Sequence, residues 1–225
     1  MTDSRAQILG TLARALSHKG RDPNAAKKRI EGHEINLIPE RGAGDRQTQV
    51  ARFTQEATTV DATVARITGD AALPGEIARY LKSANLPSIL RAAPSLKDVP
   101  WAQQPTLTVE TGIAADNDSA SVSRAFGGVA ETGTLVFLSG PDNPTTLNFV
   151  PPVHIAVLAT ADIAGDYESV WAKLRKDQAG NADFMPRTVN WITGPSRTGD
   201  IEQTLLLGVH GPHRLHIILI DETAG

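Results

Sequence analysis

Short runs of apolar residues, separated by stretches with helical spacing, fill the chain from about Thr63 onward. Several runs are apolar throughout instead of alternating, as expected of strands that are covered on both faces. Strands that alternate with helices favour an α/β fold with a largely parallel sheet. The pattern predicts strands over 63–67, 87–90, 106–109, 135–138, 154–158, 188–192 and 215–220, and helices over 73–85 and 166–176. Residues 121–134 and 198–208 fit a turn, a short helix or a strand equally well.

The first sixty residues follow a different pattern. Asp3 or Ser4 can cap a helix whose apolar residues recur at helical spacing up to Leu16. Residues 17–44 carry Gly, Pro and charge with little periodicity, which indicates a long arm or a connecting loop. A second helical stretch begins at Asp45.

Charge also divides the chain. Residues 1–60 hold ten Lys and Arg against seven Asp and Glu, whereas residues 61–225 hold twelve against eighteen. We therefore predict an N-terminal helical segment and arm over 1–60, followed by an α/β domain over 61–225.

The composition excludes several classes of function. The 225 residues include no Cys, which rules out disulfides, thiolate metal sites, iron–sulfur clusters held by cysteines of this chain and a cysteine nucleophile. A net charge of −3 gives no electrostatic reason to expect nucleic acid as a partner. No segment approaches the ~18 apolar residues of a membrane span, and the first residues lack the apolar core of a secretory signal. We therefore expect a soluble, cytoplasmic protein without a membrane span.

A turn that contains a glutamate precedes the strand predicted at 135–138. It consists of Glu131, Thr132, Gly133 and Thr134, and the last three are candidate substrate-binding residues. A carboxylate beside a glycine at the end of a buried strand can act as a nucleophile or a base. Alternatively, the Thr and Glu side chains only cap local amides in a turn. The residues alone leave both interpretations open.

A histidine stands where a rigid double proline leads into a strand, in the segment Pro151-Pro152-Val153-His154-Ile155. His154 is a candidate for proton transfer or ligand binding. The plainer interpretation is a histidine that hydrogen-bonds a backbone carbonyl.

The segment that follows the strand predicted at 188–192 is the most informative. Its candidate ligand-binding residues are Gly194, Pro195, Ser196, Arg197, Thr198, Asp200 and Glu202. Ligands of open α/β sheets bind outside the carboxyl ends of strands, and this loop has that position. Glycine and small residues let backbone amides face an anion, and Arg197 offers a fork of donors. Alternatively, an Arg–Asp pair only locks a surface loop. The spacing matches neither a Walker phosphate-binding loop nor a dinucleotide fingerprint.

Three of the six histidines lie close together, at His210, His213 and His216. A metal site with Asp200 or Glu202 can be drawn, but His216 falls inside the last apolar strand, where alternation turns it away from its neighbours. We therefore predict no metal site. A triad of Ser196, His210 and Asp200 can also be drawn, although no nucleophile elbow supports it.

Four segments together resemble one family: VAETGTLVFLSG (129–140), FVPPVHIAVL (149–158), WITGPSRTGDIEQTLLLGVHGP (191–212) and LHIILID (215–221). They are similar to the lactate-utilisation protein C family, also called LutC/YkgG or the LUD domain. The resemblance covers roughly residues 100–220 and is weaker before them. It implies a three-layer α/β fold with a mostly parallel sheet, similar to the NagB/RpiA/CoA transferase-like fold, behind an N-terminal helical extension.

The resemblance also implies a part in oxidising L-lactate to pyruvate. The family acts with two cysteine-rich partner subunits that carry iron–sulfur clusters, and the lack of Cys here fits a subunit that binds no cofactor of its own. Neither a flavin nor a nicotinamide motif is present, so this chain alone is not expected to oxidise lactate. We therefore expect an accessory subunit that binds a small carboxylate or its partner subunits.

Within that frame, Arg197 and the amides of 194–198 are expected to hold a carboxylate, and Glu131, His154 or His210 to take the hydroxyl proton. The alternative is a free-standing enzyme that acts on a small CoA-linked or phosphorylated acid, as relatives in fold do, with Glu131 as nucleophile or base. Fold analogy alone is a weak argument for that activity.

Overall fold

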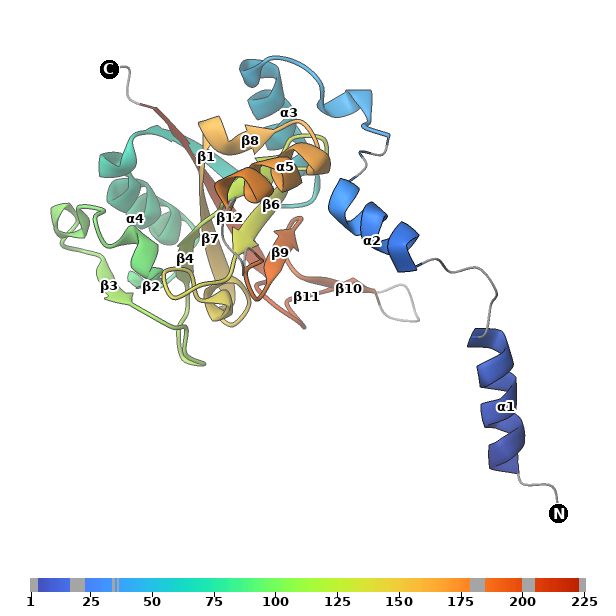
Figure 1. Cartoon of the computed structure of the whole chain (residues 1–225). Helices are drawn as coiled ribbons and strands as arrows, with labels where there is room; N and C mark the ends of the chain where they lie inside the picture. The colour runs from blue at the N-terminus through green and yellow to red at the C-terminus, as the bar shows by residue number, and fades with distance from the viewer. Residues whose placement is uncertain are drawn as a thin grey trace. The chain divides into compact units, whose positions relative to one another are not determined.

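The computed structural model describes residues 4–16, 23–33, 35, 37–178, 185–199 and 205–222. The chain divides into two units, Met1–Ile38 and Pro39–Gly225. Figure 1 labels the helices and strands of both units.

The first unit contains two helices, α1 (Ser4–Leu16) and α2 (Pro23–Gly32). The helix predicted after Ser4 is confirmed, and its apolar side chains are exposed. The interpretation of residues 17–44 as an arm or loop was wrong for α2. This helix has Ala, Lys and Arg at its centre, which are strong helix formers, and an exposed Lys27–Glu31 pair one turn apart. Because no apolar face of α2 is buried, periodicity did not reveal it.

A six-stranded, wholly parallel sheet forms the centre of the second unit. Its order is β1 (Thr63–Thr68), β12 (Arg214–Asp221), β7 (Val153–Ala159), β4 (Ser121–Arg124), β2 (Ile89–Ala92) and β3 (Thr108–Thr111). The middle strands β7 and β12 are buried on both faces, as their apolar sequences predicted. Strands β2 and β3 begin two residues later than predicted. In front of β2, Pro87 has no N–H to donate to a ladder, and in front of β3 the amide of Leu107 closes a turn onto Gln104.

A second, four-stranded sheet has the order β8 (Ile163–Ala164), β5 (Gly127–Val129), β6 (Thr134–Leu138) and β9 (Val189–Ile192). Strand β6 runs antiparallel to both β5 and β9. The ambiguous stretch 121–134 thus contributes β4 to the first sheet and β5 to the second. A two-stranded hairpin of β10 (Arg197–Gly199) and β11 (Leu205–Leu207) follows β9.

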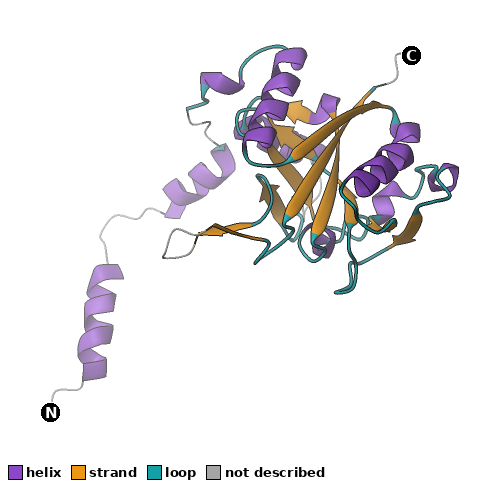
Figure 2. Cartoon of the chain, turned by 180° about the vertical axis from the view of Figure 1, so that it is seen from behind, coloured by secondary structure: helices purple, strands orange, loops and turns teal. Residues whose placement is uncertain are grey.

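Helices and the second sheet cover the two faces of the central sheet (Figure 2). Helix α4 (Leu73–Ser83) packs Leu73, Ile77 and Leu81 on one face. The other face packs against the second sheet and α3 (Arg46–Thr59), whose Phe53 is fully buried in the same hydrophobic cluster as Phe137. Helix α5 (Tyr167–Asp177) packs on the second sheet through Val170 and its neighbours. The predicted α/β fold around a mostly parallel sheet is therefore confirmed.

Helix α3 lies in the same compact unit as the sheets, although the domain boundary predicted from sequence placed it in the N-terminal segment. Its cap is as predicted, because the Asp45 carboxylate accepts a hydrogen bond from the Thr48 amide at 2.8 Å. Short 3₁₀ helices complete the unit at Glu40–Gly42, Asp70–Ala72, Pro94–Leu96, Trp101–Gln103, Thr145–Asn148 and Thr160–Asp162. None of the helices in the described part of the chain has the length and apolar character that a membrane crossing requires.

Candidate functional site

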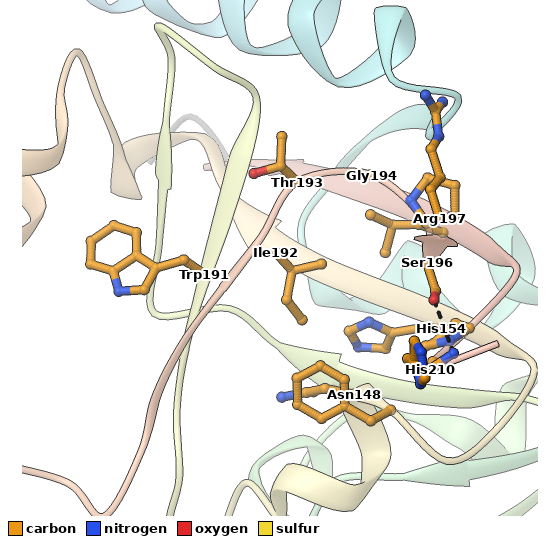
Figure 3. Close-up of a pocket in the computed structure, with 14 residues that line it drawn as sticks. Asn148, His154, Trp191, Ile192, Thr193, Gly194, Ser196, Arg197 and His210 are labelled. Atoms are coloured by element: carbon orange, nitrogen blue, oxygen red, sulfur yellow. Dashed lines mark hydrogen bonds between the residues drawn. The ribbon is translucent and has the colours of Figure 1, made fainter. Parts of the chain in front are cut away.

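A cavity of about 260 Å³ lies between β9 of the second sheet and the first residues of β7 and β12 (Figure 3). Its wall combines apolar side chains with several polar groups, as small-molecule sites do. The lining residues are Asn148, Phe149, His154, Trp191, Ile192, Thr193, Gly194, Pro195, Ser196, Arg197, His210, Gly211, Pro212 and Leu215. The structure therefore brings His154, His210 and the 194–197 bend together, as the sequence predicted.

The bend follows the carboxyl end of β9, as expected. However, β9 belongs to the second sheet, and the cavity lies at the amino ends of β7 and β12 in the central sheet. The expectation that a ligand binds beyond the carboxyl end of a strand therefore holds for β9. It does not hold for the parallel central sheet, where the cavity lies at the opposite end of the strands. Consequently, the site draws His154 and Leu215 from the second position of their strands.

Backbone hydrogen bonds hold the bend against the segment that precedes β12. The Ser196 amide donates to Pro212 O at 2.8 Å, and the Gly208 amide donates to Ser196 O at 2.9 Å. Gly194 has a φ of +75°, and a Cβ there would lie 2.6 Å from Val60 O, so only glycine fits. The bend is thus a rigid wall of the cavity.

The Ser196 hydroxyl accepts a long hydrogen bond, 3.3 Å, from the backbone amide of His210. This contact uses the backbone of His210 and leaves its imidazole to the cavity. Asp200 and Glu202 lie outside the described residues, so the triad drawn with Asp200 stays a prediction.

His154 lies on the floor of the cavity and is 1% exposed. Its Nε2 is 2.8 Å from the hydroxyl of Ser123 on β4, and that hydroxyl donates to Asn148 Oδ1 at 2.9 Å. The Phe137 ring lies 5.2 Å from its ring, centroid to centroid. Desolvation by burial lowers the pKa of His154 to about 3, so the imidazole is neutral at pH 7.

Arg197 lines the cavity, but its guanidinium pairs with Asp61, which follows α3. Figure 3 shows this side chain directed away from His154. Of the two interpretations of Arg197, the geometry favours the one in which an Arg–Asp pair locks the loop, although the partner is a residue 136 positions away in the chain. Thr198 pairs with Leu206 in the hairpin and does not line the cavity.

The turn of Glu131–Thr134 lies outside the cavity. Glu131 is buried and its Oε2 accepts a hydrogen bond from Arg41 Nε at 3.2 Å. Gly133 lies against the backbone of α3 at Ala57. Only Thr134 approaches the site, through a 2.7 Å hydrogen bond with Thr193, and it also contacts Thr132 and the Tyr167 hydroxyl. The expectation that this turn shares a pocket with the bend and the histidines was therefore wrong.

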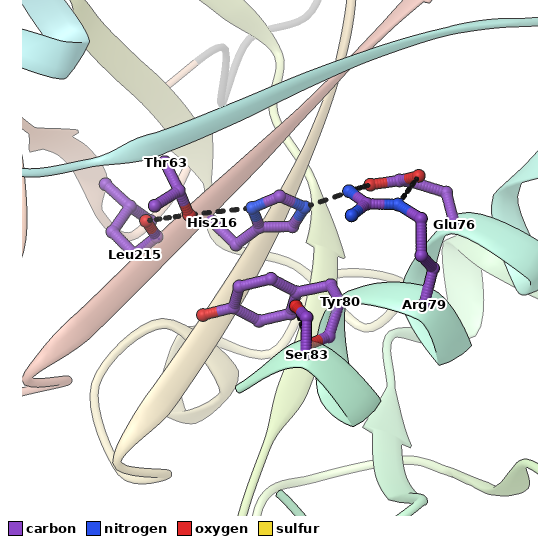
Figure 4. Close-up of polar contacts among 7 residues, drawn as sticks. All are labelled: Thr63, Glu76, Arg79, Tyr80, Ser83, Leu215 and His216. Atoms are coloured by element: carbon purple, nitrogen blue, oxygen red, sulfur yellow. Dashed lines mark hydrogen bonds and ion pairs between the residues drawn. The ribbon is translucent and has the colours of Figure 1, made fainter. Parts of the chain in front are cut away.

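His216 lies on the opposite face of the central sheet, under α4 (Figure 4). Its ring stacks on Tyr80 at 3.8 Å, its Nδ1 is 2.8 Å from the Thr63 hydroxyl, and its Nε2 is 3.6 Å from Glu76. Desolvation by burial lowers the pKa of His216 to about 4, against the opposing effect of the Glu76 carboxylate. Over the described ranges, no group of three His, Asp or Glu side chains could hold a metal ion.

Sequence reasoning missed Asn148 and Ser123, which are both buried and both belong to the site. Asn148 stands three residues before the double proline that leads into the strand of His154. A polar amide so close to that segment was the sequence feature that could have identified Asn148 as a site residue. Ser123 had none, because its stretch had no clear periodicity and its contact with His154 depends on the pairing of β4 with β7.

The model of the LUD domain family matches residues 50–220, which include both sheets and the whole lining of the cavity. The chain belongs to the LUD domain family. Similar curated proteins include an uncharacterised protein of Neisseria meningitidis serogroup B, 39% identical over 104 residues, which are 46% of this chain and 43% of that protein. Lactate utilization protein C of Geobacillus sp. (strain WCH70) is 34% identical over 47% of this chain and 44% of its own length. Lactate utilization protein C of Bacillus subtilis is 34% identical over 42% of this chain and 39% of its own length.

The match thus spans less than half the length of each of these three relatives. The crystal structure of a DUF162 family protein from Deinococcus radiodurans has a TM-score of 0.57 to this LUD chain and is 24% identical. It covers 79% of this chain and 99% of its own, and it supports the fold alone.

Proposed function

We propose that this LUD-domain chain takes part in lactate utilisation by binding a small 2-hydroxy carboxylate in the cavity lined by His154, Ser196 and His210. The observation that carries the proposal is this preformed cavity, which brings a buried imidazole, a hydroxyl and a second imidazole together beside apolar side chains. The names of the relatives supply the substrate class, since several are lactate utilization protein C.

The polar groups of the cavity suit the two ends of such a ligand. His210 and Ser196 lie at the bend and offer donors to a carboxylate, whereas His154 lies on the floor, where a hydroxyl would sit. The paired Arg197 then holds the bend in place. Because the chain has no cysteine, cysteine-ligated iron–sulfur clusters would belong to two partner subunits, and this chain would act as their accessory subunit.

The alternative, a free-standing enzyme on a CoA-linked or phosphorylated acid, gains no support from the geometry. It requires Glu131 as nucleophile or base, and this carboxylate is 5% exposed, is paired with Arg41 and lies outside the cavity. We therefore keep the binding role as the proposal.

Binding of L-lactate is expected to raise the melting temperature of the purified chain. At one hundred times Kd, a ligand that binds only the native state adds ~2.7 kcal/mol of stability, which corresponds to roughly 5–10 °C for a chain of this size. Differential scanning fluorimetry measures the shift. His210→Ala, which removes a donor from the cavity, should abolish most of it, whereas the control His213→Ala, an exposed histidine outside this cavity, should keep it.

The same screen includes pyruvate and sugar phosphates. If neither L-lactate nor any of these compounds raises the melting temperature, the binding role is refuted.

The proposed role as an accessory subunit has its own measurement. Deletion of the gene should abolish growth on lactate, and the tagged chain should co-purify with two cysteine-rich proteins. Normal growth without such partners would contradict the accessory-subunit proposal.

The Arg197–Asp61 pair is expected to act on the bend and not on the ligand. Arg197 is partly exposed and Asp61 is exposed, and surface pairs of this kind contribute about 0–1 kcal/mol. Arg197→Ala and Asp61→Asn should therefore weaken lactate binding to the same small extent, at most about fivefold, as measured by calorimetric titration. Asn keeps the left-handed backbone of Asp61, whose φ is +65°. A large loss in Arg197→Ala alone would instead assign the guanidinium to the carboxylate.

A further inference from the structure

The protons around His154 can be counted. A serine hydroxyl has one proton, and Ser123 donates it to Asn148 Oδ1 at 2.9 Å. The 2.8 Å contact between Ser123 Oγ and His154 Nε2 therefore needs the imidazole N–H as its donor. Because the buried ring is neutral and carries only one proton, Nδ1 is left with an unshared electron pair.

This Nδ1 has no hydrogen-bond partner in the described part of the chain, and it exposes less than 1 Å² to water. A buried acceptor without a donor is unfavourable, and each such group calls for an explanation. The described part of the chain has four other buried polar atoms without a partner, on Arg52, Asn143, Asn190 and His216, and none of these four residues lines the cavity. His154 forms part of the cavity floor, so a donor that satisfies Nδ1 is expected to come from a bound ligand, and because this atom is shielded from water, a small shift of the side chains around it must accompany binding.

We propose that His154 Nδ1 accepts a hydrogen bond from the hydroxyl of the bound acid, so that the cavity selects 2-hydroxy acids over 2-oxo acids. The inference rests on the proposed function, because it assigns the selectivity of the same cavity. Ser123 and Asn148 are positioning residues: they hold the proton on Nε2 and keep Nδ1 as an acceptor.

The selectivity follows from the charge distribution of the two ligand classes. The hydroxyl of L-lactate presents a hydrogen to the unshared pair of Nδ1. The oxo oxygen of pyruvate has only unshared pairs, and it would repel Nδ1 and leave it unsatisfied. Both acids have the same carboxylate, so the difference arises at this one contact. We expect the cavity to bind L-lactate at least about tenfold more tightly than pyruvate.

Calorimetric titration of the full chain with L-lactate, pyruvate and propionate tests the inference. Propionate has neither hydroxyl nor oxo group, and it is expected to bind more weakly than lactate and at least as tightly as pyruvate. Equal affinity for lactate and pyruvate would overturn the inference and leave the proposed function intact. Binding of none of the three would refute the proposed function itself. Tighter binding of pyruvate would mean that Nδ1 carries the proton, which also overturns the inference.

Two serines on β4 form a matched pair of variants. Ser123→Ala removes the acceptor for Nε2–H, and the lactate-to-pyruvate ratio should fall towards one while propionate still binds. Ser121→Ala is the control, because Ser121 is equally buried and its hydroxyl donates to Leu147 O, whereas of these two serines Ser123 is the one hydrogen-bonded to the His154 ring. It should leave the ratio unchanged, and an equal fall of the ratio in both variants would contradict the assigned role of Ser123.

A measurement on the unmodified chain tests the inference even if the variants fail to fold. Nitrogen-15 NMR of the imidazoles distinguishes a protonated ring nitrogen from one with an unshared pair. We expect His154 to show the proton on Nε2 at pH 7. A proton on Nδ1 would refute the inference whatever the variants do.

Discussion

Replacing Gly133 with Ala should lower the free energy of unfolding by about 2–5 kcal/mol, the combined size of backbone strain and overpacking. Gly133 has a φ of +65°, and a Cβ there would lie 2.3 Å from the amide nitrogen of Ala57 and 2.8 Å from its Cα. These are backbone atoms of α3, so no side-chain rotation can relieve the collision. The turn would have to leave the helix and would disturb the packing of Phe53.

Urea unfolding followed by circular dichroism measures this loss. The control is Gly140→Ala, because a Cβ at Gly140 meets nothing within 4 Å and its φ needs no glycine, so its effect should stay within about 0.5 kcal/mol. If Gly133 instead contacts the ligand, as the sequence suggested, Gly133→Ala would weaken lactate binding at unchanged stability. That result would contradict the structural role.

Acidification from pH 7 to pH 4 should remove stability on the order of 3 kcal/mol for each of His154 and His216, since each pKa unit corresponds to about 1.36 kcal/mol. Burial lowers the pKa of His154 to about 3 and that of His216 to about 4, whereas the unfolded chain has the ordinary value of 6.5. The unfolded state therefore binds more protons below pH 6.5. Stability is fully present above that pH and is lost as the pH falls towards 4.

The charged groups around the two rings differ. Glu76 raises and Arg79 lowers the pKa of His216, whereas burial alone acts on His154. Carboxylates with a lowered pKa, such as Asp118 and Asp221, lose most of their contribution below pH 3.8, so the histidines dominate the window above it.

Urea titrations at several pH values test this expectation. Between pH 6.5 and 4 the slope of the free energy of unfolding should correspond to about two protons taken up on unfolding. His216→Gln and His154→Gln should each lower that number by about one, and the double variant should flatten the slope. A slope that is the same in the wild type and in all three variants would exclude the two histidines as its cause.

The strands and helices were predictable where the local pattern carried the information. The runs that became β6, β7 and β12 are apolar at nearly every position, and burial on both faces requires such a run. Helix α2 was not predictable in this way, because it buries no apolar face and depends on helix propensity and an exposed ion pair.

The candidate site was predicted in part. The bend at 194–197, His154 and His210 do share a cavity. Short segments rich in glycine, proline, serine, arginine and histidine were enough to identify these residues from the sequence. Glu131 was wrongly added to the same pocket. Thr134 contacts Thr193 at the rim, but the chain before it turns back towards α3, so Glu131 contacts Arg41 instead.

Local patterns in the sequence determined which segments become strands, that both faces of the central sheet are covered, and that the chain belongs to the LUD domain family. Such features depend on the spacing of neighbouring residues. Only the tertiary structure decided that the cavity opens at the amino ends of β7 and β12, that Arg197 pairs with Asp61 and that the Ser123 hydroxyl contacts His154 Nε2. Those features depend on which strands pair and how two sheets stack, and contacts between residues 31 to 136 positions apart leave no periodic trace in the chain.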